Sequence, residues 1–154
     1  MSVFLANEQS EPVETSGLRN LAELVVSEEG YPETTQVAIL LVSEEEIAGY
    51  NRRFLDRDGP TDVLAFPVET LIPGVVPDLD PHGPPLIAGD VIIAPAYVHR
   101  QAESFEVTPE EEMALMVTHG ILHLLGYDHE TDEEAEHMEQ RERDLLAKVG
   151  RTRR

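Results

Sequence analysis

Three of the six histidines lie close together in the sequence, at His119, His123 and His129. His119 and His123 stand four positions apart, so on a helix both imidazoles project from one face and can grip a single cation. A chain reversal at Gly126 can bring His129 back toward the same point. Three neutral imidazoles with a free fourth position are typical of a catalytic zinc site rather than a closed structural one. The spacing therefore predicts one metal ion per chain, with these three residues as its ligands and as the catalytic centre. Zinc is the ion we expect, and three imidazoles also suit nickel or copper.

The residues beside these histidines limit the chemistry. Asp128 is a candidate hydrogen-bond acceptor that fixes the tautomer of a ligand ring. In His-Glu-x-x-His metalloproteases, the residue after the first ligand is the general base, but here that residue is Gly120, which has no carboxylate. A zinc ion can still lower the pKa of a bound water to about 7 and polarise a phosphoryl oxygen. Proton transfer must then come from elsewhere in the chain or be unnecessary.

Histidines on an apolar helix also have a purely structural interpretation. A single such residue is more often a hydrogen-bonded core histidine than a metal ligand. Two unpaired rings inside the apolar run 113–125 would each cost roughly 1–3 kcal/mol, which favours a metal. The remaining histidines are isolated in polar or loop contexts, and we expect them at the surface: His82, His99 and His137.

The elements that must position these groups follow from hydrophobic spacing and from turn residues. We expect strands over residues 2–8, 35–42, 62–68 and 89–94. We expect a capping box between Ser43 and Glu46 at the start of the second helix, and a fourth helix that is apolar almost all round. The Pro- and Gly-rich stretch 69–86 is interpreted as a long excursion between two strands. The expected helices cover residues 13–29, 43–55, 95–105, 108–125 and 131–149.

This order of elements predicts a single α+β domain over residues 1–154. We expect a small mixed β-sheet of about four strands with packed helices. The metal site would lie on the central, buried helix.

The acidic charge balance restricts how this protein can bind nucleic acid. The 31 acidic and 11 basic residues give a formal net charge of −20, and such a field repels phosphate backbones and acidic membranes. A nucleic-acid role therefore requires a local basic patch, a metal or a partner that carries positive charge.

The sequence has no cysteine, no apolar stretch near the roughly 18 residues that span a bilayer and no signal-peptide pattern at its start. We therefore expect a cytoplasmic protein with no membrane partner.

The histidine segment has a wider likeness. Residues 119–129, HGILHLLGYDH, resemble the signature of the YbeY family, bacterial rRNA maturation factors regarded as metal-dependent endoribonucleases. Two further segments are similar to that family and occur in the same order, GPTDVLAFP at 59–67 and AGDVII at 88–93. The start of the chain, ANE at 6–8, also fits. The resemblance spans nearly the whole chain.

The resemblance implies a function as well as a fold. It implies an α+β fold with a zinc ion in a cleft, held by His119, His123 and His129, and cleavage of single-stranded RNA. In the family this means late maturation of the 3′ end of small-subunit rRNA and quality control of 70S ribosomes. The candidate partners are then single-stranded RNA, the small ribosomal subunit, and a ribosomal protein or a GTPase.

The sequence departs from the family pattern in places that concern RNA binding. Many members carry an arginine, thought to bind RNA phosphate, where this chain has Leu55. Ala65 replaces the usual serine, which is a minor change. The acidic net charge is a further departure, and it favours capture through a ribosomal protein over unaided RNA capture. The RNA-contact candidates that can supply the missing charge are Arg52, Arg53 and Arg57.

Two other segments have more than one interpretation. Thr61 and Asp62 are RNA-contact candidates if they line the cleft, but a Pro-Thr-Asp turn also satisfies its own backbone through side-chain oxygens, and the turn interpretation is slightly favoured. The basic end of the chain contains Arg151, Arg153 and Arg154. We expect this end to be frayed and solvated rather than a binding arm.

Three functions are compatible with these observations. The first is a zinc-dependent, single-strand-specific endoribonuclease in rRNA processing. The second is a ribosome assembly factor whose metal is mainly structural and which cleaves little or no RNA. The third is a zinc hydrolase of another substrate, such as a peptidase, against which Gly120 argues.

Overall fold

The computed structural model describes residues 2–154. In this part of the chain, one mixed sheet is formed by four strands: β1 (Val3–Asn7), β2 (Gln36–Leu41), β3 (Val63–Pro67) and β4 (Ile87–Ile93). The strand order is β1-β2-β4-β3, so β2 and β4 are central. β1 and β4 pair with β2 in parallel, whereas β3 runs antiparallel to β4. The predicted α+β class with about four strands is confirmed.

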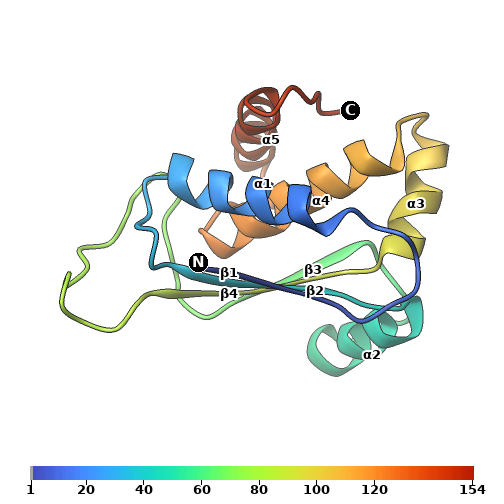
Figure 1. Cartoon of the computed structure of the whole chain (residues 1–154), viewed down its shortest axis with the longest axis horizontal. Helices are drawn as coiled ribbons and strands as arrows, with labels where there is room; N and C mark the ends of the chain where they lie inside the picture. The colour runs from blue at the N-terminus through green and yellow to red at the C-terminus, as the bar shows by residue number, and fades with distance from the viewer. Residues whose placement is uncertain (1) are drawn as a thin grey trace.

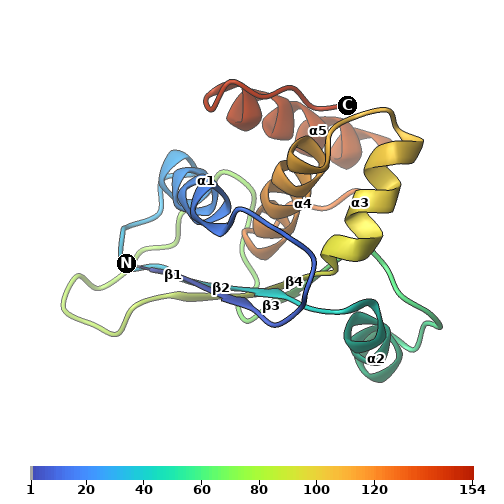
Figure 2. The same ribbon diagram turned by 45° about the vertical axis from the view of Figure 1, so that its right-hand side comes forward.

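Most of the helices pack on one face of this sheet (Figures 1 and 2). α4 lies over β3 and β4, α1 lies beside it, and α5 covers α4 from outside. α2 lies on the opposite side of the sheet, where Ile47 packs with Val42, Leu64 and Ile92. The helices of the described chain are α1 (Thr15–Glu28), α2 (Glu44–Leu55), α3 (Pro95–Ser104), α4 (Pro109–Leu124) and α5 (Asp132–Ala147).

α4 is the buried helix that the sequence predicts. Thr108 caps it, because the hydroxyl oxygen accepts a hydrogen bond from the Glu111 amide (3.1 Å), and Pro109 occupies the first helical position. Nearly every residue from Glu112 to Leu124 is buried. Because its apolar side chains face the sheet on one side and α1 and α5 on the other, α4 forms the centre of the main core.

The expected capping box at Ser43 is only half formed. The Ser43 hydroxyl accepts from the Glu46 amide (3.1 Å), but the Glu46 carboxylate lies near that hydroxyl (3.4 Å) instead of bonding the Ser43 amide. The reciprocal arrangement occurs at α5, where Thr131 and Glu134 bond each other's backbone amides. None of the helices in residues 2–154 is long and apolar enough to cross a membrane.

Candidate metal centre

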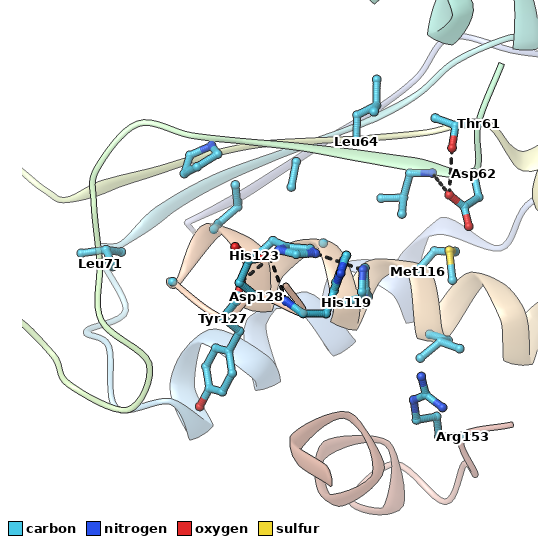
Figure 3. A pocket seen from close by; sticks show the side chains of 18 of the residues that line it. Thr61, Asp62, Leu64, Leu71, Met116, His119, His123, Tyr127, Asp128 and Arg153 are labelled. Carbon is cyan, nitrogen blue, oxygen red and sulfur yellow. Dashed lines mark hydrogen bonds between the residues drawn. The ribbon is translucent and has the colours of Figure 1, made fainter. Parts of the chain in front are cut away.

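The structure brings the three predicted histidines together at the C-terminal end of α4. Figure 3 shows two of them, His119 and His123, side by side on this helix. The Nε2 atoms of His119 and His123 are 3.1 Å apart. The ring centroid of His129 lies 4.9 Å from that of His123 and 5.5 Å from that of His119. One ring nitrogen from each residue lies within 4.8 Å of the other two. The cluster is therefore compact enough to hold one metal ion.

Gly126 makes this convergence possible. Its φ of +105° is a conformation that other residues rarely adopt, and a Cβ on it would lie 2.2 Å from the Leu71 carbonyl oxygen. The chain reverses there, and the Tyr127 amide bonds back to the Leu122 carbonyl at 3.0 Å. The reversal returns His129 to the end of the helix that carries the other two histidines.

In two of the three imidazole rings, the Nδ1 atom, which faces away from the cluster, is hydrogen-bonded to an acceptor. His119 Nδ1 lies 2.6 Å from Glu142 Oε2, and His123 Nδ1 lies 2.9 Å from the Tyr127 carbonyl oxygen. A carboxylate and a carbonyl only accept, so each Nδ1 carries the proton and donates it. In the neutral rings, both Nε2 atoms then present lone pairs to each other.

Two facing lone pairs at this distance are unfavourable unless a cation lies between them. Tetrahedral zinc with Zn–N distances of about 2.0–2.1 Å holds its ligand nitrogens about 3.3 Å apart, close to the 3.1 Å between His119 and His123. The acceptors behind the rings are the contacts that orient ligating histidines in metal sites. The residues present therefore fit a zinc ion.

Asp128, which the sequence suggested as a ring partner, makes another contact. Its Oδ1 accepts a hydrogen bond from the backbone amide of His129 at 2.8 Å. It thereby shapes the turn that carries the third histidine. Its proposed effect on a ring tautomer stays a prediction.

Burial controls the electrostatics of the cluster. It lowers the pKa of His123 to about 4, with further contributions from His119 and His129. Burial alone would raise the pKa of Glu142, but its hydrogen bonds with His119 and Arg153 outweigh this and hold that pKa below its ordinary value. At neutral pH, His123 is therefore a free base and Glu142 a carboxylate, the forms that a metal site requires.

The histidines open into a pocket of about 640 Å³ between α4, β3 and the loop after β3. Its lining includes three arginines, Arg57, Arg153 and Arg154. Of these, Arg57 makes no ion pair within residues 2–154, whereas the other two are paired with carboxylates. Arg52 and Arg53 lie on α2 outside this lining. Arg52 pairs with Asp58 (2.9 Å), and Arg53 lies 5.6 Å from the ring of Phe54.

Thr61 and Asp62 line the same pocket, across from the histidines in Figure 3. Asp62 Oδ1 accepts from the Val63 amide (2.7 Å) and lies 3.2 Å from the Thr61 hydroxyl, so the turn satisfies its own backbone. Asp62 Oδ2 accepts from Gln101 (3.1 Å). Thr61 and Asp62 therefore form a self-satisfied turn and also line the pocket. Leu55 is exposed at the end of α2, and Ala65 is part of the pocket wall.

The basic end of the chain is not frayed, contrary to expectation. Arg153 Nε donates to Glu142 Oε1 at 2.7 Å. Arg154 donates to both carboxylate oxygens of Glu112 (2.7 and 2.9 Å) and lies over the ring of Phe105. The physical reason is that both glutamates are almost fully buried, and buried carboxylates require a cation.

Glu142 is a site residue that the sequence did not single out. It lies on the stripe of α5 that also carries Met138, Leu145 and Leu146, and all four residues are buried. A charged residue on an otherwise apolar helix face is a signal of a buried, partnered carboxylate. The position was visible in the sequence, but its partners, His119 and Arg153, were not.

Together, the mixed sheet and the histidine cluster make this an α+β protein with a candidate metal centre in a cleft, and comparison with known proteins gives its family. The chain matches the family model described as Endoribonuclease YbeY over residues 4–150. An Endoribonuclease YbeY of Acidothermus cellulolyticus is 41% identical over 137 residues, which cover 88% of this chain and 83% of that protein. One of Thermobifida fusca is 39% identical over 96% of this chain and 93% of that protein. The chain therefore belongs to the YbeY family, and this membership supports an endoribonuclease role.

A solved structure has the same fold. The solution structure of TM1509 from Thermotoga maritima superposes with a TM-score of 0.62 at 28% identity. The match covers 96% of this chain and 91% of that one. The family model and the two relatives confirm the family resemblance noted in the sequence.

Proposed function

We propose that this protein is a zinc-dependent endoribonuclease that cleaves single-stranded RNA. We further propose that it acts in late maturation of the small-subunit rRNA 3′ end and in 70S ribosome quality control. Its partners would be the small subunit and a ribosomal protein or GTPase, in the cytoplasm, and residues 1–154 would form one hydrolase domain. Family membership supports the RNA-cleaving part.

One observation carries the metal part of the proposal. The Nε2 atoms of His119 and His123 converge to 3.1 Å while their Nδ1 atoms are held by a carboxylate and a carbonyl. His119, His123 and His129 would hold the ion, with one coordination position open to the pocket. Zinc in such a site supplies Lewis-acid polarisation of a phosphoryl oxygen and lowers the pKa of a coordinated water.

Three other polar residues of the pocket are placed to contact the substrate: Arg57, Thr61 and Asp62. Arg57, which has no ion-pair partner in the described chain, is the guanidinium free to contact an RNA phosphate. Arg52 and Arg53 lie farther along α2 and would contact RNA only outside the pocket. Thr61 and Asp62, whose side chains are hydrogen-bonded to each other, line the pocket across from the histidines. They can hydrogen-bond a ribose 2′-hydroxyl, a group that distinguishes RNA from DNA.

The peptidase alternative has a steric argument against it as well as a chemical one. A Cβ on Gly120 would lie 2.5 Å from a methyl carbon of Val91 in β4. No glutamate can therefore occupy the position next to His119 without moving α4 off the sheet. The general base of the His-Glu-x-x-His enzymes has no room here.

The test uses the full chain on a single-stranded RNA oligonucleotide, its matched duplex and casein. We expect cleavage of the single strand only. A chelator or His123→Ala should abolish that cleavage, and added zinc should restore it to the chelator-treated wild type. His82→Ala is the matched control, because it removes an exposed imidazole from the loop before β4. RNA cleavage that survives His123→Ala would overturn the metal mechanism. Casein cleavage would favour the peptidase, and zinc binding without RNA cleavage would favour the assembly factor.

A further inference from the structure

The C-terminal arginines connect to the metal centre through a buried carboxylate. Glu142, on α5, has no exposed surface and accepts from two sides. Its Oε2 receives His119 Nδ1 at 2.6 Å, and its Oε1 receives Arg153 Nε at 2.7 Å. One carboxylate thus joins the end of the chain to a predicted metal ligand.

The charge of Glu142 has one permanent counter-charge. His119 contributes a neutral N–H donor when its Nε2 is free to bind a metal, so it does not neutralise the carboxylate. A buried, uncompensated carboxylate is strongly unfavourable. Arg153 is therefore the group that keeps Glu142 charged, buried and aimed at His119.

Each guanidinium nitrogen of Arg153 lies within 3.4 Å of a protein oxygen, which separates this residue from a substrate-binding arginine. Besides the bond to Glu142, its Nη1 donates to the Arg154 carbonyl oxygen at 2.7 Å and its Nη2 lies 3.4 Å from Glu139. All three guanidinium nitrogens have a partner. Its place in the pocket lining is thus structural support rather than a free contact for phosphate.

A parallel set of contacts starts at the next residue. Arg154 donates hydrogen bonds to both carboxylate oxygens of Glu112 on α4. The Oε2 atom of Glu112 also accepts a hydrogen bond from Gln101 at 2.7 Å. Gln101 also donates to Asp62 on the opposite wall of the pocket (3.1 Å). The end of the chain thereby ties α5, α4 and the turn before β3 to one another around the cluster.

We propose that Arg153 is a positioning residue of the metal centre, which sets metal affinity by holding Glu142 against the Nδ1 of His119. The proposal rests on the proposed metal ligation by His119. Arg154 supports the same arrangement from α4. Nothing in the spacing of residues 151–154 marks this role, because it depends on the end of the chain folding back over α5 and α4.

The experiment measures zinc affinity by competition with a chromophoric chelator, without RNA. Loss of a group that orients a ligand weakens metal binding by roughly 10–100-fold, and we expect about tenfold for Arg153→Gln. Arg151→Gln is the matched control, because it removes an equal charge two residues away with no ion pair within residues 2–154, and we expect a change below about twofold. Arg153→Lys, which keeps a cationic donor, should recover most of the affinity.

A double-mutant cycle shows whether Arg153 acts through Glu142. In a Glu142→Gln background, Arg153→Gln should weaken zinc binding by no more than about twofold further. If Arg153→Gln does not fold by circular dichroism, Arg153→Met, which keeps the alkyl stem, takes its place in the cycle. Independent, additive effects of the two substitutions would overturn the proposal.

His119→Ala separates this inference from the proposed function. If His119→Ala abolishes zinc binding while Arg153→Gln binds as the wild type does, the positioning role is wrong and the metal site stands. If His119→Ala binds zinc normally, the metal site itself is wrong. Equal affinities of the Lys and Gln variants at position 153 would also overturn the proposal, since charge would then be irrelevant.

Discussion

Gly120 tests whether the packing of α4 against the sheet places the histidines. A Cβ on this residue would lie 2.5 Å from Val91 Cγ1 and 3.2 Å from Val91 Cγ2, whereas ordinary contacts are 3.4–4 Å. Val91 is fully buried in a central strand and β-branched, so its methyl groups cannot rotate away. Gly120→Ala must therefore push α4 from β4 by about 1 Å.

The magnitude follows from two opposing effects. Overpacking a core of this kind costs about 1–3 kcal/mol, and replacing glycine by alanine inside a helix returns about 0.5–1 kcal/mol. The middle values of these two ranges give a net loss of about 1 kcal/mol in the free energy of unfolding by urea. The shift of α4 also separates His119 and His123 from His129, so zinc affinity should fall by about tenfold.

Two further variants make this prediction specific. Gly49 is exposed on α2, and nothing lies within 4 Å of the position that a Cβ would take there, so Gly49→Ala should stabilise the protein by about 0.5–1 kcal/mol. Val91→Ala should relieve the clash, giving a coupling energy with Gly120→Ala of about 1–2 kcal/mol. A Gly120→Ala protein as stable as the wild type, with unchanged zinc affinity, would show that this contact does not place the histidines.

Three other predictions follow from the site. Arg57→Gln should weaken binding of a non-cleavable single-stranded RNA and reduce the slope of log affinity against log salt concentration by about 0.7. The control Arg52→Gln should leave that slope nearly unchanged, and equal slopes for the two variants would show that Arg57 does not contact the RNA. In the metal-free protein, burial lowers the pKa of His123 to about 4, so between about pH 6.5 and 4 the unfolded chain binds a proton that the folded one does not. The free energy of unfolding should therefore be undiminished by this group above pH 6.5 and should fall as the pH is lowered from about 6.5 to 4. An NMR titration showing the His123 ring charged at pH 5.5 would contradict this. Tyr127→Phe removes the hydroxyl that donates to Glu29, so it should cost about 1–2 kcal/mol in urea unfolding, and an unchanged midpoint would show that this bond contributes nothing.

The fold and the histidine cluster could be predicted because their causes are local. Helix spacing places His119 and His123 on one face, and the glycine at 126 marks the reversal that returns His129. Thr108 and Pro109 mark the start of α4, and the apolar run that follows shows that the helix is buried. The four strands likewise follow from short apolar runs bounded by turn residues.

The contacts that hold the histidines in place could not be predicted, because they join residues that are far apart in the sequence. Glu142 meets His119 across 23 positions of sequence, and Arg154 meets Glu112 across 42. An arginine near the end of a chain has the same local pattern whether it is solvated or paired. Only the burial of both carboxylates decides between these states, and burial depends on how α5 packs on α4.

The proposed chemistry depends on three imidazoles holding one metal ion at the end of α4. The decisive test is elemental analysis of the purified full chain and of His119→Ala, each after removal of loosely bound metal. We predict about one equivalent of zinc per wild-type chain and none in the variant. Metal absent from both proteins, or retained in the variant, would contradict this and leave only a structural histidine cluster.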